Sequence, residues 1–178
     1  TVLQMEMTEC GAASLSIILQ YYGRYIPLTE LRQTCGVSRD GSDAASLIKA
    51  ARSYGLEAKG YKMSLARLRK ETPPLILFWE FNHFLVFEGF IGDQVALNDP
   101  AAGPRSVSLE EFDRSYTGVA LAMVPGPAFR RGGRRPSFWA AVGERLLLEK
   151  GGVLFLPRAG FAQIVPSLPK PNFSQDYI

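Results

Sequence analysis

The stretch QMEMTECGAASLSIILQYYG, residues 4–23, is mostly apolar and contains Cys10, one of the two cysteines of the chain. Its apolar residues recur at helical spacing from Thr8 onward until Gly23 ends the segment, so the sequence predicts a helix with Thr8 as N-cap. Small and apolar residues also fill the other faces, which indicates a buried helix. Cys10 is then placed at the helix N-terminus, where unpaired N–H groups and the helix dipole stabilise a thiolate.

The rest of the chain divides into a helical half and a strand-rich half. Two short helices, a strand and a helical turn are predicted in the first half, at residues 27–36, 41–55, 56–63 and 64–71. Beyond Pro74 the pattern changes to short runs rich in Val, Ile, Leu and Phe, which are typical of antiparallel strands. These runs are residues 75–81, 83–91, 94–100, 105–109 and 118–124. The order predicts an α+β fold with N-terminal helices packed on a C-terminal antiparallel sheet.

Composition narrows the classes of function. The chain has 178 residues, of which 47% are hydrophobic, enough to bury the core of one globular domain. A net charge of +3 is too small to indicate nucleic-acid binding, and the one dense basic cluster is RRGGRR at residues 130–135. Two cysteines without a recognisable signal peptide favour reduced thiols in a cytoplasmic environment over a disulfide.

Domain boundaries are predicted from a change of composition after residue 126. Residues 1–126 form the expected globular domain, and residues 127–136, rich in Pro, Gly and Arg, look like a linker. Residues 137–178 begin with an amphipathic helix pattern, and the apolar run that follows is interrupted by Arg158, Lys170 and several prolines. That run lacks the roughly 18 uninterrupted apolar residues that a membrane-spanning helix needs.

Three further positions can complete a site around Cys10. The only histidine of the chain, His83, stands at the start of a predicted strand and can act as the base that a thiolate nucleophile needs. Asp99, or its neighbour Asn98, lies at the end of the next strand and can fix the tautomer of the imidazole. Gln4 precedes the cysteine, and its amide N–H can face the oxyanion of acyl transfer.

Each of these residues also has a purely structural interpretation. Cys10 can pack as a small hydrophobe, His83 can end a strand in contact with water, and Asp99 can form a turn. Gln4 can be solvated, and Cys35 is interpreted as a packing residue because its surroundings offer no base. The cysteines and the histidine lack the short ligand spacing of a zinc site, so no metal or other cofactor is predicted. The order glutamine, cysteine, histidine, and then aspartate or asparagine is nevertheless that of papain-like cysteine peptidases.

Most of residues 1–125 resembles one family of proteins. The matching segments are LQMEMTECGAASLSIILQYYG, LRQTCGVSRDG, NHFLVFEGF, LNDPAAGPRSVSLEEF and YTGVAL. They resemble the bacteriocin-processing cysteine peptidase domain, the double-glycine leader peptidase at the N-terminus of peptidase-containing ABC transporters. The segments QMEMTECGAASL and SRDGS are most similar to those of the subgroup that exports peptides with nitrile-hydratase-like or Nif11-like leaders, including lanthipeptide precursors.

The resemblance implies a papain-like fold and a role for each candidate residue. Cys10 matches the nucleophile and His83 the general base and acid. Asp99 matches the orienting carboxylate, and Gln4 matches the glutamine of the oxyanion hole. The implied reaction is cleavage after a Gly-Gly or Gly-Ala pair in a precursor peptide with an amphipathic helical leader. Glu9 departs from the family pattern, since many members have Asp before the cysteine, but little effect is expected because the charge is kept.

The resemblance also implies partners outside this chain. Family members continue into transmembrane helices and a nucleotide-binding domain, whereas the chain has no G-x-x-x-x-G-K-[ST] phosphate loop. It is therefore expected to be an excised or modified peptidase fragment, in which residues 137–178 are a lateral helix and an altered remnant of a first transmembrane segment. The parent transporter is expected to be a homodimer with this domain at the cytoplasmic face of the bacterial plasma membrane and residues 130–135 beside the lipids. The isolated domain is expected to be a soluble monomer.

Three other interpretations stay open on the sequence alone. A domain that docks the leader without cleaving it would share the fold, but the presence of both Cys10 and His83 disfavours it. Another Cys-His-Asp enzyme of acyl transfer would share the chemistry without needing a Gly-Gly site. The Arg-rich and apolar tail could also make the chain mainly a membrane-surface element.

Overall fold

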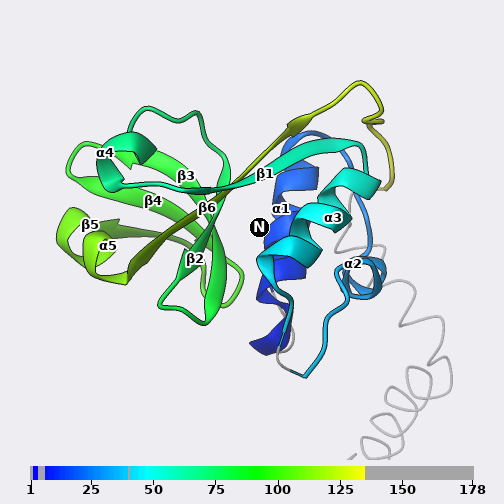
Figure 1. Cartoon of the computed structure of the whole chain (residues 1–178), viewed down its shortest axis with the longest axis horizontal. Coiled ribbons are helices and arrows are strands. Elements are labelled where there is room, and N and C mark those ends of the chain that lie inside the picture. The colour runs from blue at the N-terminus through cyan, green and yellow to red at the C-terminus, as the bar shows by residue number, and fades with distance from the viewer. Residues whose placement is uncertain (1, 4–6, 40, 135–178) are drawn as a thin grey trace, which may run out of the picture. The chain divides into compact units, whose positions relative to one another are not determined.

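The computed structural model describes residues 2–3, 7–39 and 41–134 (Figure 1). Their helices are α1 (Cys10–Tyr21), α2 (Leu28–Thr34), α3 (Ala44–Ser53), α4 (Leu65–Leu68) and α5 (Leu109–Ser115), and a 3₁₀ turn, η1 (Met7–Glu9), precedes α1. Their strands are β1 (Leu56–Lys62), β2 (Leu75–Trp79), β3 (His83–Ile91), β4 (Gln94–Asp99), β5 (Gly103–Ser108) and β6 (Tyr116–Pro125). Helices lead and strands follow, which confirms the predicted α+β class.

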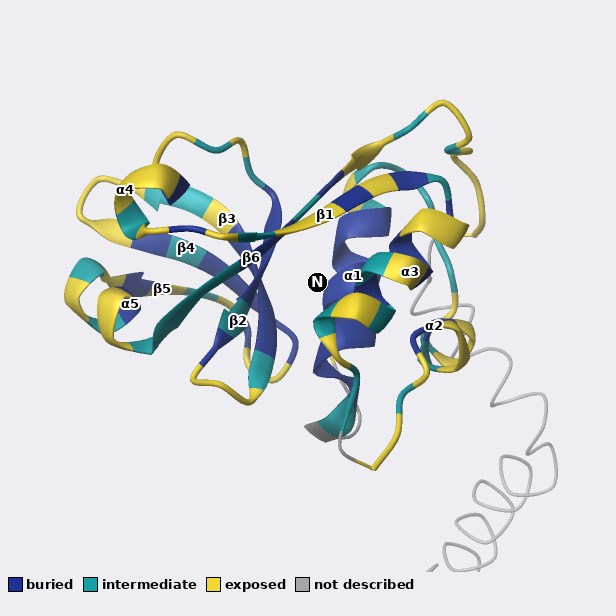
Figure 2. Cartoon of the chain, viewed as in Figure 1, coloured by how far each residue is buried: buried dark blue, intermediate teal, exposed yellow. Residues whose placement is uncertain are grey.

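Helix α1 is buried on nearly all sides, as its sequence predicts (Figure 2). Ala12, Leu15 and Ile18 are fully buried in a core shared with α2, α3 and the sheet. Ser14 is buried as well, and its Oγ donates a hydrogen bond of 3.1 Å to the backbone carbonyl of Phe84 on β3. This bond and the packing around it fix the N-terminal half of α1 against the start of β3.

The N-terminus of α1 differs from the sequence prediction. Thr8 lies within η1, and Glu9 occupies the cap position with helical backbone angles and no side-chain capping bond. The Glu9 side chain is 1% exposed, and its Oε1 atom lies 2.8 Å from Nη1 of Arg32 on α2. A tertiary ion pair therefore stands where a local cap was expected. Cys10 is still the first residue of the helix.

The six described strands form one antiparallel sheet in the order β1-β6-β2-β3-β4-β5. Side chains alternate between its two faces, and both faces are covered. Ile76 and Val86 join the core under α1, α2 and α3, whereas Leu77 and Phe87 join a second core with Phe112 of α5. Because neighbouring strands are antiparallel, the beginning of β3 and the end of β4 lie at the same edge of the sheet.

Helix α5 is absent from the elements predicted from sequence. Its N-cap is Ser108, whose Oγ accepts a hydrogen bond of 3.2 Å from the backbone N–H of Glu111. Serine followed three residues later by glutamate is a helix-start pattern, so the sequence did contain a signal for this helix. Phe112 on its buried face lies 5.5 Å from Trp79 between ring centroids. The helix thus closes the second core and brings Glu111 next to β5.

The described part of the predicted linker, residues 127–134, lies against the helical half. The backbone N–H of Tyr25 donates a hydrogen bond of 2.8 Å to the carbonyl of Gly132. The Phe129 ring packs edge-on against Tyr22, with 6.3 Å between centroids. This stretch is therefore bound to the end of α1 rather than solvated along its whole length.

The lateral helix and altered transmembrane segment predicted at residues 137–178 lie outside the described residues, as do residues 135–136 of the linker. The predicted domain boundaries accordingly stay predictions. Within residues 2–3, 7–39 and 41–134, no helix combines the length and the apolar character that a bilayer crossing requires.

Candidate active site

Three of the four predicted site residues meet at one edge of the sheet. Cys10 begins α1, His83 begins β3 and Asp99 ends β4. The Nε2 atom of His83 lies 2.7 Å from Oδ1 of Asp99, and the Cys10 thiol is close enough to the same imidazole for each group to shift the pKa of the other. Since Nε2 faces the carboxylate, Nδ1 is the ring nitrogen left for the thiol. The fourth predicted residue, Gln4, lies outside the described residues.

The hairpin of β3 and β4 explains how His83 and Asp99 come together. Val86 pairs with Asn98 in this hairpin, so the antiparallel register brings Asp99 opposite Leu85, two residues from His83 and on the same face of the sheet. Helix α1, which carries Cys10, is joined to the start of β3 by the hydrogen bond from Ser14 Oγ to the Phe84 carbonyl, and the backbone N–H of Phe84 lowers the pKa of the Cys10 thiol. The Ser14–Phe84 and His83–Asp99 hydrogen bonds thus bring together residues that are far apart in the sequence.

Asn98 was the alternative to Asp99 in the sequence, and the structure separates the two. Successive side chains of a strand point to opposite faces, so only one of these neighbours can meet His83. The Nδ2 atom of Asn98 donates a hydrogen bond of 2.8 Å to Oε1 of Glu88, while Asp99 is hydrogen-bonded to the His83 imidazole. The carboxylate is therefore the group placed to orient the histidine.

The electrostatics of the site favour a charged thiolate and imidazolium. Burial raises the pKa of Cys10, but hydrogen bonds from His83 and from the backbone N–H groups of Phe84 and Gly11 bring that pKa below its ordinary value. Burial lowers the pKa of His83, but its hydrogen bonds to the thiol and to Asp99, with their negative charge, raise it above the ordinary value. Both shifts favour transfer of the thiol proton to the imidazole.

Asp99 is held ionised by contacts that the sequence did not reveal. Burial raises its pKa, but the hydrogen bonds from His83 and the Ala101 backbone N–H and the charge of Arg105 lower it below the usual value. Oδ1 accepts from Ala101 at 2.9 Å, and Oδ2 lies 3.2 Å from Nη2 of Arg105. Arg105 pairs with Leu97, two residues before Asp99, and so lies on the same face of the sheet. That neighbourhood follows from the β4–β5 register, which the sequence pattern alone did not define.

The other cysteine, Cys35, is in a different environment. It is fully buried in the helical core, and burial raises the pKa of its thiol to about 11. This placement agrees with the packing role predicted for it. As for metals, the part of the chain that the structure describes contains no group of three or more His, Cys, Asp or Glu side chains arranged to hold an ion.

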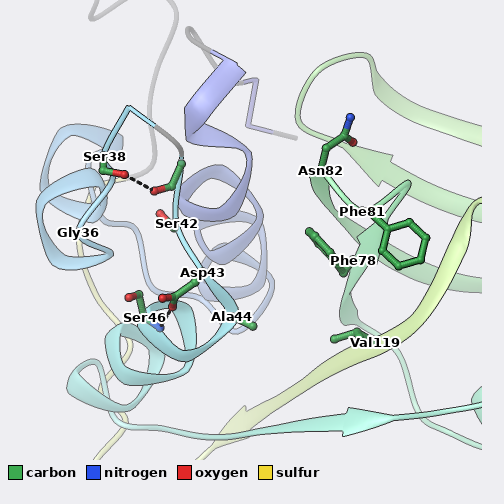
Figure 3. Close-up of a pocket in the computed structure, with 11 residues that line it drawn as sticks. Gly36, Ser38, Ser42, Asp43, Ala44, Ser46, Phe78, Phe81, Asn82 and Val119 are labelled. Atoms are coloured by element: carbon green, nitrogen blue, oxygen red, sulfur yellow. Dashed lines mark hydrogen bonds between the residues drawn. The ribbon is translucent and has the colours of Figure 1, made fainter.

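A cleft of about 630 Å³ opens between the helical half and the β2–β3 hairpin (Figure 3). One wall is small and polar and comes from the segment that joins α2 to α3, with Ser38, Ser42 and Asp43, and from Ser46 in the first turn of α3. The other wall carries Phe78, Phe81, Asn82 and Val119. Asn82 directly precedes His83, and the Phe78 ring lies 4.9 Å from the Phe84 ring between centroids. The cleft therefore borders the residue next to His83, although neither Cys10 nor His83 is among the residues that line it.

The hairpin at the mouth of this cleft has an unusual backbone. Glu80 and Phe81 have φ angles of 48° and 59°, in the left-handed region that non-glycine residues rarely adopt. Ser115 at the end of α5 holds the turn, since its carbonyl accepts from the Glu80 N–H at 2.9 Å and its Oγ donates to Glu80 Oε1 at 3.1 Å. The result is that Phe81 is 79% exposed two residues before His83.

The family pattern of Peptidase C39 matches residues 1–128. The chain belongs to this family. The C39 domain is similar to the crystal structure of a double glycine motif protease from an AMS/PCAT transporter in complex with the leader peptide. The two are 52% identical with a TM-score of 0.69, and the match covers 70% of this chain and 90% of that one. The papain-like fold and the cysteine peptidase class predicted from sequence are thereby confirmed.

Full-length relatives of the C39 domain are much longer proteins. The chain is 37% identical over 127 residues to the colicin V secretion/processing ATP-binding protein CvaB of Escherichia coli. It is 33% identical over 135 residues to the transport/processing ATP-binding protein ComA of Streptococcus pneumoniae. Each match covers 71% of this chain but only 18% and 19% of the respective relative. The chain thus spans about a fifth of their length, and its leader subgroup stays a prediction.

The pKa shifts predict selective alkylation of one cysteine in the C39 domain. At about pH 6 an ordinary thiol is almost fully protonated, whereas the lowered pKa of Cys10 leaves more of it as thiolate. Iodoacetamide is therefore expected to modify Cys10 and to spare Cys35, and the Cys10 rate should fall as the pH drops through its pKa. Peptide mass spectrometry after timed quenching measures both rates. Equal rates for the two cysteines in the folded chain would contradict the assignment of a thiolate to Cys10.

Proposed function

We propose that this C39 domain removes the leader from a ribosomally made bacteriocin or lanthipeptide precursor by cutting after a Gly-Gly or Gly-Ala pair. The observation that carries the proposal is the hydrogen-bonded His83–Asp99 pair beside the Cys10 thiol, whose pKa His83 lowers, with Cys10 at a helix N-terminus and a cleft lined by Asn82 next to His83. In this proposal Cys10 is the nucleophile, His83 is the general acid and base, and Asp99 orients the imidazole.

The first half of the reaction forms a thioester. The Cys10 thiolate attacks the carbonyl carbon of the second small residue, forming the S–C bond and placing the electron pair on the carbonyl oxygen. When the tetrahedral intermediate collapses, the C–N bond breaks and the His83 imidazolium gives its proton to the leaving amine nitrogen. The core peptide departs with a free amino terminus, and the leader stays bound to sulfur.

The second half of the reaction is hydrolysis of the thioester. His83, now neutral, takes a proton from water as the water oxygen attacks the thioester carbonyl. The S–C bond breaks, the leader leaves as a carboxylate after losing its proton, and the thiolate–imidazolium pair is restored. Asp99 keeps the imidazole in place through both steps because its Oδ1 atom holds Nε2 at 2.7 Å.

The oxyanion of both intermediates needs hydrogen-bond donors. The backbone N–H of Cys10, at the junction of η1 and α1, is proposed as the first donor. The side-chain amide of Gln4 is proposed as the second donor, from its match to the family motif. A single donor of this kind contributes about 10²–10³ to kcat in other enzymes.

The cleft beside the site is proposed to hold the leader segment that precedes the glycine pair. Apolar leader side chains would pack on Phe78 and Phe81, while the opposite wall with Ser38 and Ser42 offers polar partners. Support comes from the 52%-identical protease that was solved in complex with its leader peptide. Small residues at the cut would be required because Cys10 is only 6% exposed.

The proposed setting is the N-terminal part of an ABC exporter. Relatives of the C39 domain are parts of secretion/processing ATP-binding proteins, of which this chain matches about a fifth. We place the domain at the cytoplasmic face of the bacterial plasma membrane, in a homodimeric parent transporter that exports the trimmed peptide. A leader of the nitrile-hydratase-like or Nif11-like type and an isolated domain that is monomeric belong to the same proposal.

A leader peptide series tests the proposed cleavage. The parent sequence ends in Gly-Gly before a short core, and two variants carry Gly-Val and Val-Val at the same positions. Turnover is expected to fall steeply with the size of the second residue, since its carbonyl must reach a buried thiol. Binding of all three peptides, followed by fluorescence anisotropy, is the control and should change little. Equal turnover of the three peptides would indicate a different Cys-His-Asp acyl-transfer enzyme.

A further inference from the structure

The Asp99 carboxylate is a crowded group that has only one orientation suited to the site. Its side chain is 7% exposed, and Oδ1 receives both His83 Nε2 at 2.7 Å and the Ala101 N–H at 2.9 Å. The other oxygen, Oδ2, faces Nη2 of Arg105 at 3.2 Å. A partial rotation of this carboxylate would move Oδ1 away from both of its donors and Oδ2 away from Arg105.

Arg105 is itself held by groups from two other elements besides Asp99. It projects from β5, its guanidinium lies 5.7 Å over the ring of Trp79 on β2, and Nη1 is 3.6 Å from Oε1 of Glu111 on α5. Its Nε atom is buried and has no hydrogen-bond partner among the described residues, so both carboxylates are met by the terminal amino groups. The guanidinium is therefore held by contacts other than the one with Asp99.

We propose that Arg105 is a positioning residue, which holds the Asp99 carboxylate ionised and oriented so that His83 stays aligned with the Cys10 thiol. The inference rests on the proposed role of the Asp99–His83 pair. Arg105 touches neither the substrate nor the thiol, and it acts through Asp99. Arg105 is held in turn by its cation–π contact with Trp79 and its ion pair with Glu111. Glu111 belongs to α5, a helix that is absent from the elements predicted from sequence.

The physical reason is the cost of an isolated buried charge. A carboxylate that loses its cation in a largely desolvated place tends to take up a proton or to turn toward solvent. Either change removes the acceptor of His83 Nε2–H. The charged groups that face Asp99 are His83 from β3 and Arg105 from β5, with Cys10 of α1 behind the imidazole and Glu111 of α5 behind the guanidinium.

The lone histidine of the chain makes the test direct, because every imidazole signal in an NMR spectrum belongs to His83. Arg105→Met is compared with Arg67→Met, a matched control in which the lost arginine also has an ion pair, with Glu71, and an aromatic partner, Tyr61. In Arg105→Met, the signal of the downfield Nε2–H proton of His83 should broaden or move upfield. The pKa of the His83 imidazole should fall. With leader peptide, kcat should drop about tenfold to a hundredfold, with little change of KM.

The direction of the His83 shift decides the inference. If Asp99 stays ionised and in place without Arg105, removal of a nearby cation can only raise the pKa of His83, and that result overturns the proposal. A kcat within about twofold of the Arg67→Met control overturns it as well. Partial return of the Nε2–H signal in Arg105→Lys is expected, since the charge returns without the planar fork.

Two further points keep the test decisive. If Arg105→Met does not fold, Arg105→Gln replaces it as a smaller, neutral change, with the same signal expected to move and the same rise of the pKa counting against the proposal. The NMR measurement needs no substrate, so it separates two failures. A chain that cleaves no leader but shows the predicted His83 response contradicts the proposed function and leaves the role of Arg105 intact.

Discussion

A Cys10→Ala chain is expected to cleave no leader peptide while still binding it. The reason is that the proposed thioester requires sulfur, and no other nucleophile of the described site lies against His83. The substitution removes a small side chain at the first position of α1, where alanine is an excellent helix former, so folding should be kept. Cleavage followed by mass spectrometry and leader binding followed by anisotropy measure the two properties separately.

The second cysteine supplies the matched control. Cys35→Ala removes the same atom from the same chain, but from the helical core, where burial raises the thiol pKa to about 11. This variant is expected to lose some stability, on the order of 1 kcal/mol or more for a buried side chain cut back to alanine, and to retain the turnover of the parent. Loss of turnover in Cys35→Ala with full turnover in Cys10→Ala would reverse the assignment of the nucleophile.

Replacement of His83 by alanine is expected to lower kcat/KM by about 10²–10⁴-fold, the usual contribution of a positioned acid and base. The thiol should also lose reactivity at about pH 6, because the hydrogen bond and charge of His83 are what bring the Cys10 pKa down against the effect of burial. Both effects are read from one preparation, by peptide turnover and by the rate of alkylation of Cys10.

Added imidazole separates a chemical role of His83 from a structural one. A small base can enter the space that the His83→Ala change leaves and should restore part of the turnover in a concentration-dependent way. It should restore nothing in Cys10→Ala, which lacks the nucleophile. If His83→Ala keeps the thiol reactivity of the parent chain, the histidine does not activate the cysteine and the proposed pair is wrong.

Much of the fold and most of the candidate site could be predicted because their signals are local. The buried helix of Cys10 follows from its continuous apolar character, and the contact of His83 with Asp99 follows from two strands joined by a short turn. Antiparallel neighbours meet at their opposite ends, so the spacing along the chain translates directly into proximity. The choice between Asp99 and Asn98 needed the structure, because it depends on which of the two side chains lies on the same face of the sheet as His83.

The features that escaped prediction depend on contacts between elements distant in sequence. The sequence predicts Thr8 as the N-cap, but the start of α1 is held instead by the ion pair between the buried Glu9 side chain and Arg32 of α2. Arg105 looks like an ordinary strand residue until the β4–β5 register places it beside Asp99. Gln4 lies outside the described residues, so its place in the oxyanion hole stays a prediction carried by the family motif.

The most direct test of the central claim is mass spectrometry of a Gly-Gly leader peptide after incubation with the parent chain in water enriched in heavy oxygen. The predicted result is a leader fragment that ends at the second glycine and carries heavy oxygen in its new carboxylate, with a core peptide that has a free amino terminus. An intact peptide that binds tightly would make the domain a docking module. A leader transferred to another acceptor without heavy oxygen would make it an acyl-transfer enzyme, and either result would contradict the proposed leader peptidase.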